Sequence, residues 1–140
     1  MDAIEKIAIW SAEMNDEAGA TAGLLKALSN AGADLQFALA RRQPDKPGKG
    51  ILFVSPIAGR KQEEAARNAG FEPRSDAVGV RLEGTNKAGL GAHLTEALGK
   101  AGLSLRALMA NVIGKNFVIV FAFDSEADAD QGIQILRRLP

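Results

Sequence analysis

Two polar loop segments of the sequence carry side chains that could hold a small charged molecule. Asp16 and Asn86 each stand three residues before a glycine, Gly19 or Gly89, where a helix-period apolar pattern begins. A helix N-terminus presents unpaired N–H groups and a partial positive charge, which suit a carboxylate. Glycine has no Cβ, so a ligand can approach its backbone closely. The chemistry of these loops is therefore compatible with a small-ligand site.

The polar residues of the two loops have more than one possible role. Asp16 could accept hydrogen bonds from an ammonium group, and Asn15, Thr85 and Asn86 could donate and accept them. The alternative is that Asp16 and Asn86 only cap a helix or turn the chain. The two glycines could equally serve close packing of a helix on a strand.

No catalytic or metal-binding constellation is found in the sequence. His93 is the only histidine, the chain has no cysteine, and His93 lies beside the apolar stripe of a predicted helix. A lone histidine is a poor metal site and cannot complete a triad by itself. Residues 89–93 (GLGAH) lack the GK[ST] ending of a phosphate loop. We therefore expect a non-enzymatic protein without metal or cofactor; an enzyme on this scaffold, dependent on His93, is the minor alternative.

The composition limits partners and location. The 17 basic and 17 acidic residues balance, which argues against nucleic acid as the main partner. The absence of cysteine suits a reducing compartment. The first ten residues lack the apolar region of a signal peptide. The longest apolar run, Phe117–Phe123, is too short to span a membrane. We expect a cytoplasmic protein that does not associate with membranes.

The sequence contains an internal repeat with an offset of 70 residues. Residues 16–35 (DEAGATAGLLKALSNAGADL) match residues 86–105 (NKAGLGAHLTEALGKAGLSL) without a gap. In each copy the apolar spacing predicts a helix, and Gly32 or Gly102 is placed to end it. The repeat predicts two small units, at residues 1–75 and 76–140.

Local patterns predict the other elements. In the first unit we expect strands at 6–10, 33–41 and 51–55, a polar loop at 11–16, helices at 19–31 and 60–69, and an edge strand at 71–75. In the second we expect strands at 77–83, 103–112 and 116–124, the repeat helix, and a last helix at 125–139 capped by Ser125.

This order is βαββα with a short edge strand, then βαββα. It predicts an α+β protein of two ferredoxin-like βαββαβ repeats, the second lacking its final strand. Each antiparallel sheet should carry its helices on one face.

The sequence resembles stand-alone tandem ACT domain proteins over nearly its whole length. The most specific segments are NDEAG (residues 15–19) followed by LLKALSNAGADL, and TNKAG (residues 85–89) followed by LTEALGKAGLSL. Ala18 and Ala88 stand where this family usually has proline.

The resemblance implies a regulatory module that binds a small ligand, usually an amino acid. The ligand is expected at the junction of two repeats, beside the loops between first strand and first helix. It also implies a homodimer and a possible regulated enzyme. The alternative is an interaction module that pairs with an enzyme or transporter without a ligand. The expected ligand-binding residues are Met14, Asn15, Asp16, Ala18, Gly19, Thr85, Asn86, Ala88, Gly89 and Leu90.

Overall fold

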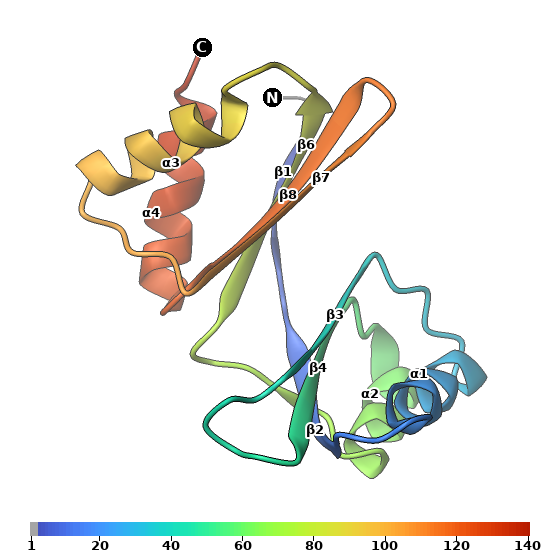
Figure 1. The fold of residues 1–140 in the computed structure, drawn as a ribbon. Helices are drawn as coiled ribbons and strands as arrows, with labels where there is room; N and C mark the ends of the chain where they lie inside the picture. Colours follow the sequence, from blue (N-terminus) through green and yellow to red (C-terminus); the bar gives the residue numbers. More distant parts are fainter. Residues whose placement is uncertain (1–2) are drawn as a thin grey trace. The chain divides into compact units, whose positions relative to one another are not determined.

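The computed structural model describes residues 3–140, which form two compact units. The first-repeat unit is Ala8–Arg74, and the second-repeat unit is Ser75–Pro140 together with the first strand. The strands are β1 (Ala3–Ile7), β2 (Trp10–Asn15), β3 (Phe37–Arg42), β4 (Lys49–Ser55), β5 (Glu72–Pro73), β6 (Val78–Thr85), β7 (Ala107–Ile113) and β8 (Asn116–Phe123). The helices are α1 (Ala20–Asn30), α2 (Gly59–Asn68), α3 (Leu90–Lys100) and α4 (Glu126–Arg137) (Figure 1).

The first-repeat unit has an antiparallel sheet in the order β3-β4-β2-β5. Alternate residues of β2 and β4 pack with one face of α1 and α2, as period-2 and period-3.6 apolar patterns require. Trp10 is buried there, at 4% exposure. The small core is formed by Trp10, Ala12, Leu28, Leu52, Val54, Ala66 and Phe71.

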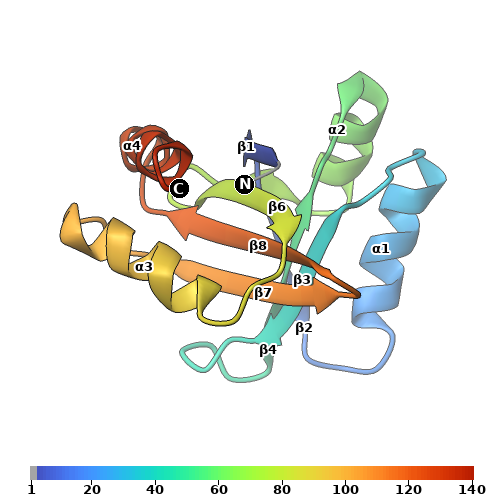
Figure 2. The same ribbon diagram turned by 90° about the horizontal axis from the view of Figure 1, so that it is seen from above.

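The second-repeat unit has an antiparallel sheet in the order β1-β6-β8-β7. Helices α3 and α4 lie along one face of this sheet (Figure 2). The most apolar strand, β8, is central, as its composition predicts. The α+β class with two ferredoxin-like units is therefore confirmed. The core includes Val78, Val80, Leu82, Leu94, Leu98, Phe117, Ile119, Phe121, Phe123, Ala129, Ile133 and Leu136.

The strand β1 fills the position of the final strand that the second repeat lacks. Lys6 of β1 pairs with Val80 of β6. In the first-repeat unit, Trp10 is the residue that corresponds to Val80, and it pairs with Pro73 of the final strand β5. The compact units therefore differ from the predicted division at 75/76 in two respects, because Ala3–Ile7 lies with the second repeat and the boundary falls one residue earlier, before Ser75.

The single strand predicted at 6–10 is wrong. The segment contains the end of β1 and the start of β2, which belong to different sheets. The predicted polar loop at 11–16 is also wrong, because residues up to Asn15 continue β2 and pair with β4. Polar side chains do not prevent strand formation when a neighbouring strand binds the backbone groups.

The helices lie close to their predicted ranges. Ser125 caps α4 as expected, since its Oγ accepts a hydrogen bond from the Asp128 N–H at 3.1 Å. The strands after α1 and α3 begin later than predicted, at Phe37 and Ala107. The chain needs the intervening residues to return from the helix layer to the sheet.

Candidate functional site

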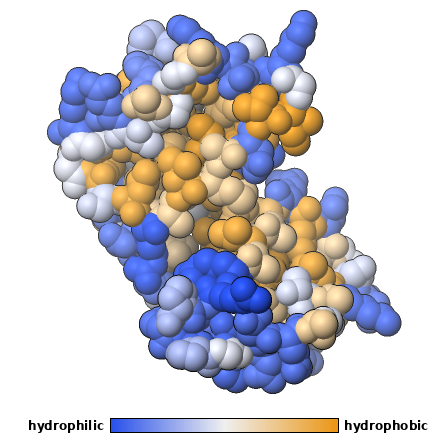
Figure 3. Space-filling view, viewed as in Figure 1, coloured by the Kyte–Doolittle hydropathy of each residue, from blue (hydrophilic) through white to orange (hydrophobic). Residues whose placement is uncertain are grey.

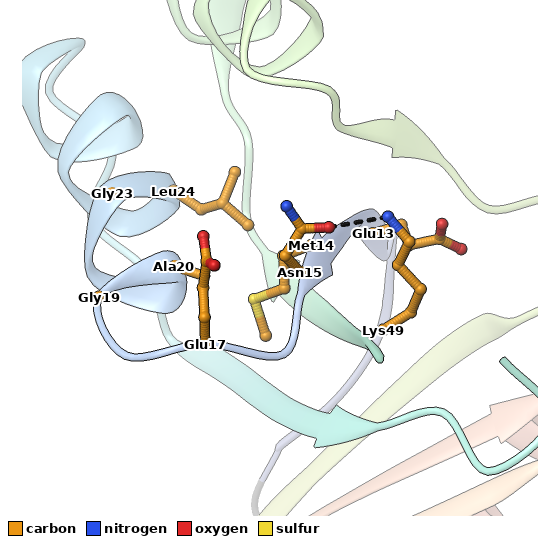
Figure 4. A pocket seen from close by; sticks show the side chains of 9 residues that line it. All are labelled: Glu13, Met14, Asn15, Glu17, Gly19, Ala20, Gly23, Leu24 and Lys49. Atoms are coloured by element: carbon orange, nitrogen blue, oxygen red, sulfur yellow. Dashed lines mark hydrogen bonds between the residues drawn. The ribbon is translucent and has the colours of Figure 1, made fainter. Parts of the chain in front are cut away.

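A cavity of about 410 Å³ lies within the first-repeat unit at the start of α1 (Figure 4). One wall is the end of β2 with the first residue of β4, and the other is the loop and first turns of α1. Its lining residues are Glu13, Met14, Asn15, Glu17, Gly19, Ala20, Gly23, Leu24 and Lys49.

Gly19 starts α1 in the left-handed conformation, with φ +88°. This backbone conformation explains the glycine, because other residues are strained there. Close packing does not explain it, since a Cβ on Gly19 would meet no atom within 4 Å. The backbone at the helix start is thus open toward the cavity.

The N-terminus of α1 has no compensating charge of its own. No side chain caps the helix, and its first turn contains no acidic residue. The capping role considered for Asp16 is therefore wrong, and the same holds for Asn86 at α3, which starts at Gly89 without a side-chain cap. An uncapped helix start favours a carboxylate from outside the helix.

The strand wall of the cavity carries an ordered polar pair. Asn15 lies opposite Lys49 in the β2–β4 ladder, and Lys49 Nζ donates to Asn15 Oδ1 at 2.8 Å (Figure 4). This bond fixes the Asn15 amide at the rim. The ammonium group of Lys49 adds a positive charge to the cavity wall, besides the partial positive charge at the start of α1.

Glu13 supplies negative charge to the same wall. Its Oε2 accepts from Lys46 Nζ at 3.0 Å and from Gln43 Nε2 at 3.1 Å. The hydrogen bond from Lys46 lowers the pKa of Glu13 below its usual value, and the bond from Gln43 lowers it further to a smaller extent. Glu13 is therefore a carboxylate at neutral pH. The cavity thus offers both signs of charge, as the two ends of a zwitterion require.

Asp16, a predicted ligand residue, does not line the cavity. Its Oδ2 lies 2.7 Å from Arg42 Nε, and its backbone N–H donates to Gly48 O at 2.9 Å. The carboxylate is already paired with a cation, so its position favours a role in holding the loop against the β3–β4 turn. Ala18 also lies outside the lining.

An apolar surface completes the cavity. Figure 4 shows the side chains of Met14, Leu24 and Glu17 reaching from strand, helix and loop into the same space. Thr21 Oγ1 donates to Met14 Sδ at 3.5 Å, which orients the thioether. Met14 and Leu24 would contact the apolar part of a ligand whose charged groups meet the helix start and the carboxylates.

The predicted residues of the second loop belong to the other unit. Asn86 N–H donates to Lys115 O at 2.7 Å, and Thr85 pairs with Asn116. None of the predicted ligand residues of the second loop lines this cavity. These residues are Thr85, Asn86, Ala88, Gly89 and Leu90. The shared site of the two loops stays a prediction.

The repeat itself shows how the two loops differ. Ala20 and Gly23 of the cavity correspond, at the offset of 70, to the larger Leu90 and His93. Gly23 lies inside α1, where glycine costs about 1 kcal/mol relative to alanine. A Cβ there would meet nothing within 4 Å, so protein packing does not require the glycine. Its small size keeps the cavity open.

Sequence reasoning missed several lining residues, notably Glu13, Glu17 and Lys49. Lys49 lies far from the predicted loop in the sequence, and only the β2–β4 register brings it beside Asn15. A signal for Gly23 was available, since comparison of the repeats gives Gly23 opposite His93.

Residues 3–140 contain no group of three histidine, aspartate or glutamate side chains placed to hold a metal ion. His93 is exposed on α3. In the same range, no helix combines the length and the apolar character needed to cross a membrane.

Comparison with known proteins gives matches among solved structures. No family model matches the sequence, and no significant match was found among curated proteins. The fold is similar to that of a protein from Bacteroides thetaiotaomicron, with a TM-score of 0.76 at 15% identity over 96% of this chain and 87% of that chain.

Aspartate kinase structures, one of them a separate regulatory subunit, contain the same fold. The regulatory subunit of aspartate kinase from Thermus thermophilus, in its ligand-free form, matches with a TM-score of 0.66 at 14% identity over 97% of this chain and 94% of that one. Aspartokinase III of E. coli, in complex with aspartate and ADP, matches with a TM-score of 0.61 at 13% identity over 96% of this chain and 32% of that one.

At these identities the similarity establishes the fold. The two units together have the fold of tandem ACT-type regulatory domains. The resemblance inferred from the NDEAG and TNKAG segments is thus confirmed at the level of the fold.

Proposed function

We propose that this protein is a non-enzymatic regulatory module that binds a small amino acid in the cavity at the start of α1. The observation that carries the proposal is the composition of that cavity. An uncapped helix start at Gly19 faces a wall that carries Glu13 and the Asn15–Lys49 pair. Its volume, about 410 Å³, lies within the range of small-molecule pockets.

The binding mode follows from charge. The ligand carboxylate meets the N–H groups at the start of α1, where the helix dipole is positive. The ligand ammonium meets the carboxylate of Glu17, since that of Glu13 is already bound by Lys46 and Gln43, and the ligand side chain contacts Met14 and Leu24. Asp16 and Ala18 shape the loop, and Asp16 acts through Arg42.

The regulated partner is proposed to be an enzyme. A similar structure is a separate regulatory subunit of aspartate kinase, and this chain spans 94% of it. A cytoplasmic location, which suits a sequence free of cysteine, is part of the same proposal. A homodimeric state is part of it too. Cell fractionation and solution mass measure them.

The alternative is an interaction module that pairs with an enzyme or transporter and binds no ligand. The Asp16–Arg42 pair favours it, because one polar group expected for a ligand is already satisfied by the protein. A stable complex with an enzyme or transporter that does not respond to any amino acid would support this alternative.

A thermal-shift scan against the twenty amino acids at millimolar concentration tests the proposal. A ligand at 100 times its Kd adds about 2.7 kcal/mol to the free energy of unfolding. We expect one or two related amino acids to raise the Tm. If no amino acid raises the Tm, the proposal is rejected.

The variant Gly23→His assigns the response to the cavity. It gives the first repeat the residue that the second repeat has, and the imidazole would occupy the cavity. We expect it to abolish the shift. The matched variant His93→Gly, at the equivalent position of α3, should leave the shift unchanged. Loss of response in both variants, or in neither, would reject the cavity as the site.

A further inference from the structure

The charged groups that line the cavity at the start of α1 are nearly all bound by the protein itself. Two hydrogen bonds from the β3–β4 turn hold Glu13, and Lys49 donates to Asn15. Glu17 is the lining carboxylate for which the described part of the chain provides no partner. In the proposed binding mode, the α-carboxylate and α-ammonium of the ligand use the helix start and Glu17. No unpaired charged group of the lining is then left for the side chain of the ligand.

Strand alternation separates the polar rim of the cavity from its floor. Met14 faces α1, because Thr21 Oγ1 donates to its Sδ at 3.5 Å and Met14 packs against the core of the first-repeat unit. Leu24 packs against the same core from α1. Successive side chains of a strand point to opposite faces, so Glu13 and Asn15 lie at the rim. We call Met14 and Leu24 the floor of the cavity, and this floor is apolar.

The surface of the unit shows the same separation of polar and apolar groups. In Figure 3, blue hydrophilic side chains cover the turn between β3 and β4, whereas α1 shows pale and hydrophobic ones. In Figure 4, the charged ends of Glu13 and Lys49 lie at the far end of the cavity from Leu24. The charge therefore gathers on one side of the cavity, and the helix side offers apolar contact.

The floor has an adjustable side chain. Met14 lies opposite Gly50 in the β2–β4 ladder. A Cβ at Gly50 would lie 3.2 Å from Met14 Cε and 3.2 Å from Arg41 O, so a larger residue would displace the end of the Met14 side chain. Methionine is unbranched and flexible, and it adapts to the shape of the groups that it contacts. The floor can therefore adjust to the shape of an apolar side chain laid on it.

The second repeat fills the corresponding space with its own apolar side chains. At the offset of 70, Met14 corresponds to Gly84, and the ladder partner of Gly84 is Phe117. Phe117 is 3% exposed in the core of the second-repeat unit, and Leu90 packs against that core. The first repeat has glycine and alanine at the matching positions of ladder and helix. Where the second repeat buries a phenylalanine ring and a leucine, the first has Met14 and the cavity.

We propose that the amino acid bound in this cavity has an uncharged apolar side chain, as leucine and methionine have, and that this side chain lies on Met14 and Leu24. The inference rests on the proposed function, because it takes the amino-acid site as given. The ligand side chain takes the part that Phe117 and Leu90 have in the second repeat. A charged side chain would enter an apolar floor without a free counter-charge, which is unfavourable.

Pairs of amino acids that are alike in shape but differ in polarity test the proposal in the wild-type chain. Leucine and asparagine branch at the same carbon, and the side chains of methionine and glutamine have similar lengths. The α-groups are identical, so a difference in Kd reports on the side chain. We expect calorimetric titration to give a Kd about ten-fold or more lower for leucine than for asparagine, and for methionine than for glutamine. Aspartate and lysine should bind more weakly than leucine and methionine.

The variant Met14→Ala assigns this preference to the floor. It removes an apolar contact of the ligand side chain, so the ratio of the asparagine Kd to the leucine Kd should fall. The matched variant Leu25→Ala removes an aliphatic side chain that packs against the same core but does not line the cavity. It should leave the ratio unchanged. A general loss of stability affects both ligands alike, and circular dichroism checks that both variants are folded.

The outcomes separate this inference from the proposed function. A wild-type chain that binds a charged or polar amino acid more tightly than leucine and methionine would overturn the inference and leave the amino-acid site standing. The inference is also overturned by a ratio that Met14→Ala leaves unchanged, or that Leu25→Ala lowers equally. A chain that responds to none of the twenty amino acids rejects the proposed function itself.

Discussion

The carboxylate of Asp16, a residue expected to meet a ligand, lies 2.7 Å from the guanidinium of Arg42. The bond joins the loop before α1 to the end of β3. The Asp16 N–H donates to Gly48 O of the same turn, which strengthens this connection. Asp16 therefore positions the loop that forms one wall of the cavity.

We predict that Asp16→Asn and Arg42→Gln weaken amino-acid binding by similar, small factors. A largely exposed ion pair contributes about 0.2–1 kcal/mol, which is up to about five-fold in affinity. Calorimetric titration of each single variant and of the double variant measures this. A large loss confined to Asp16→Asn would instead show direct contact with the ligand.

Glycine is required at the start of both repeat helices. Gly19 and Gly89 have φ values of +88° and +81°, and a side chain there is strained. We predict that Gly19→Val and Gly89→Val each lower the free energy of unfolding by about 1–2 kcal/mol or more. Gly23→Ala should raise it by up to about 1 kcal/mol, because Gly23 is a helix residue without positive φ or close neighbours. Urea unfolding measures the change in the free energy of unfolding for the three variants. Equal changes would contradict the argument that positive φ values require glycine at positions 19 and 89.

Gly132 in α4 packs directly on the ring of Phe123. A Cβ at Gly132 would lie 2.6 Å from Phe123 Cζ, and this ring is fully buried. We predict that Gly132→Ala costs about 1–3 kcal/mol through overpacking. Gly91→Ala in α3, with no atom within 4 Å, should be stabilising by about 0.5–1 kcal/mol. Chemical denaturation of both variants measures the change in the free energy of unfolding. Opposite signs for the two variants would show that the contact with Phe123, rather than helix propensity, decides the effect at Gly132.

The Glu13–Lys46 interaction should give a pH-dependent contribution to stability. The pKa of Glu13 is lowered in the folded state, first by the hydrogen bond from Lys46 and then by that from Gln43. The folded state thus binds fewer protons than the unfolded state near pH 4.5, the ordinary pKa of a glutamate side chain, and stability falls as the pH falls through this region.

We therefore expect Glu13→Gln to lower the Tm at pH 7 and to have little effect well below the folded pKa, where the wild-type carboxyl is protonated too. Thermal unfolding of both proteins across acid pH measures the difference. A Tm difference that does not change with pH would show that Glu13 acts by packing.

Much of the fold follows from local patterns, whereas strand pairing does not. The stripe that ends at Gly32 and its copy that ends at Gly102 predict both repeat helices to within about a residue. The segment at 6–10 reads as one strand because four of its five residues are apolar. Its division between two sheets depends on β6, more than 70 residues away.

The candidate site shows the same limit. Met14, Asn15 and Gly19 could be predicted because they flank one loop of the repeat. Glu13 and Lys49 could not, since the β2–β4 register brings them to the cavity. The Asp16–Arg42 bond depends on the length of the β3–β4 turn, which the second repeat does not share.

The pairing of β1 with β6 has a consequence for synthesis of the chain. β1 is synthesised before the first-repeat unit, but its partner residues, from Gly79 to Glu83, follow only after that whole unit. That unit can close by itself, because its four strands lie between Trp10 and Pro73. The second sheet joins β1 to strands that follow the whole first-repeat unit, so we expect its assembly to be the later and slower event.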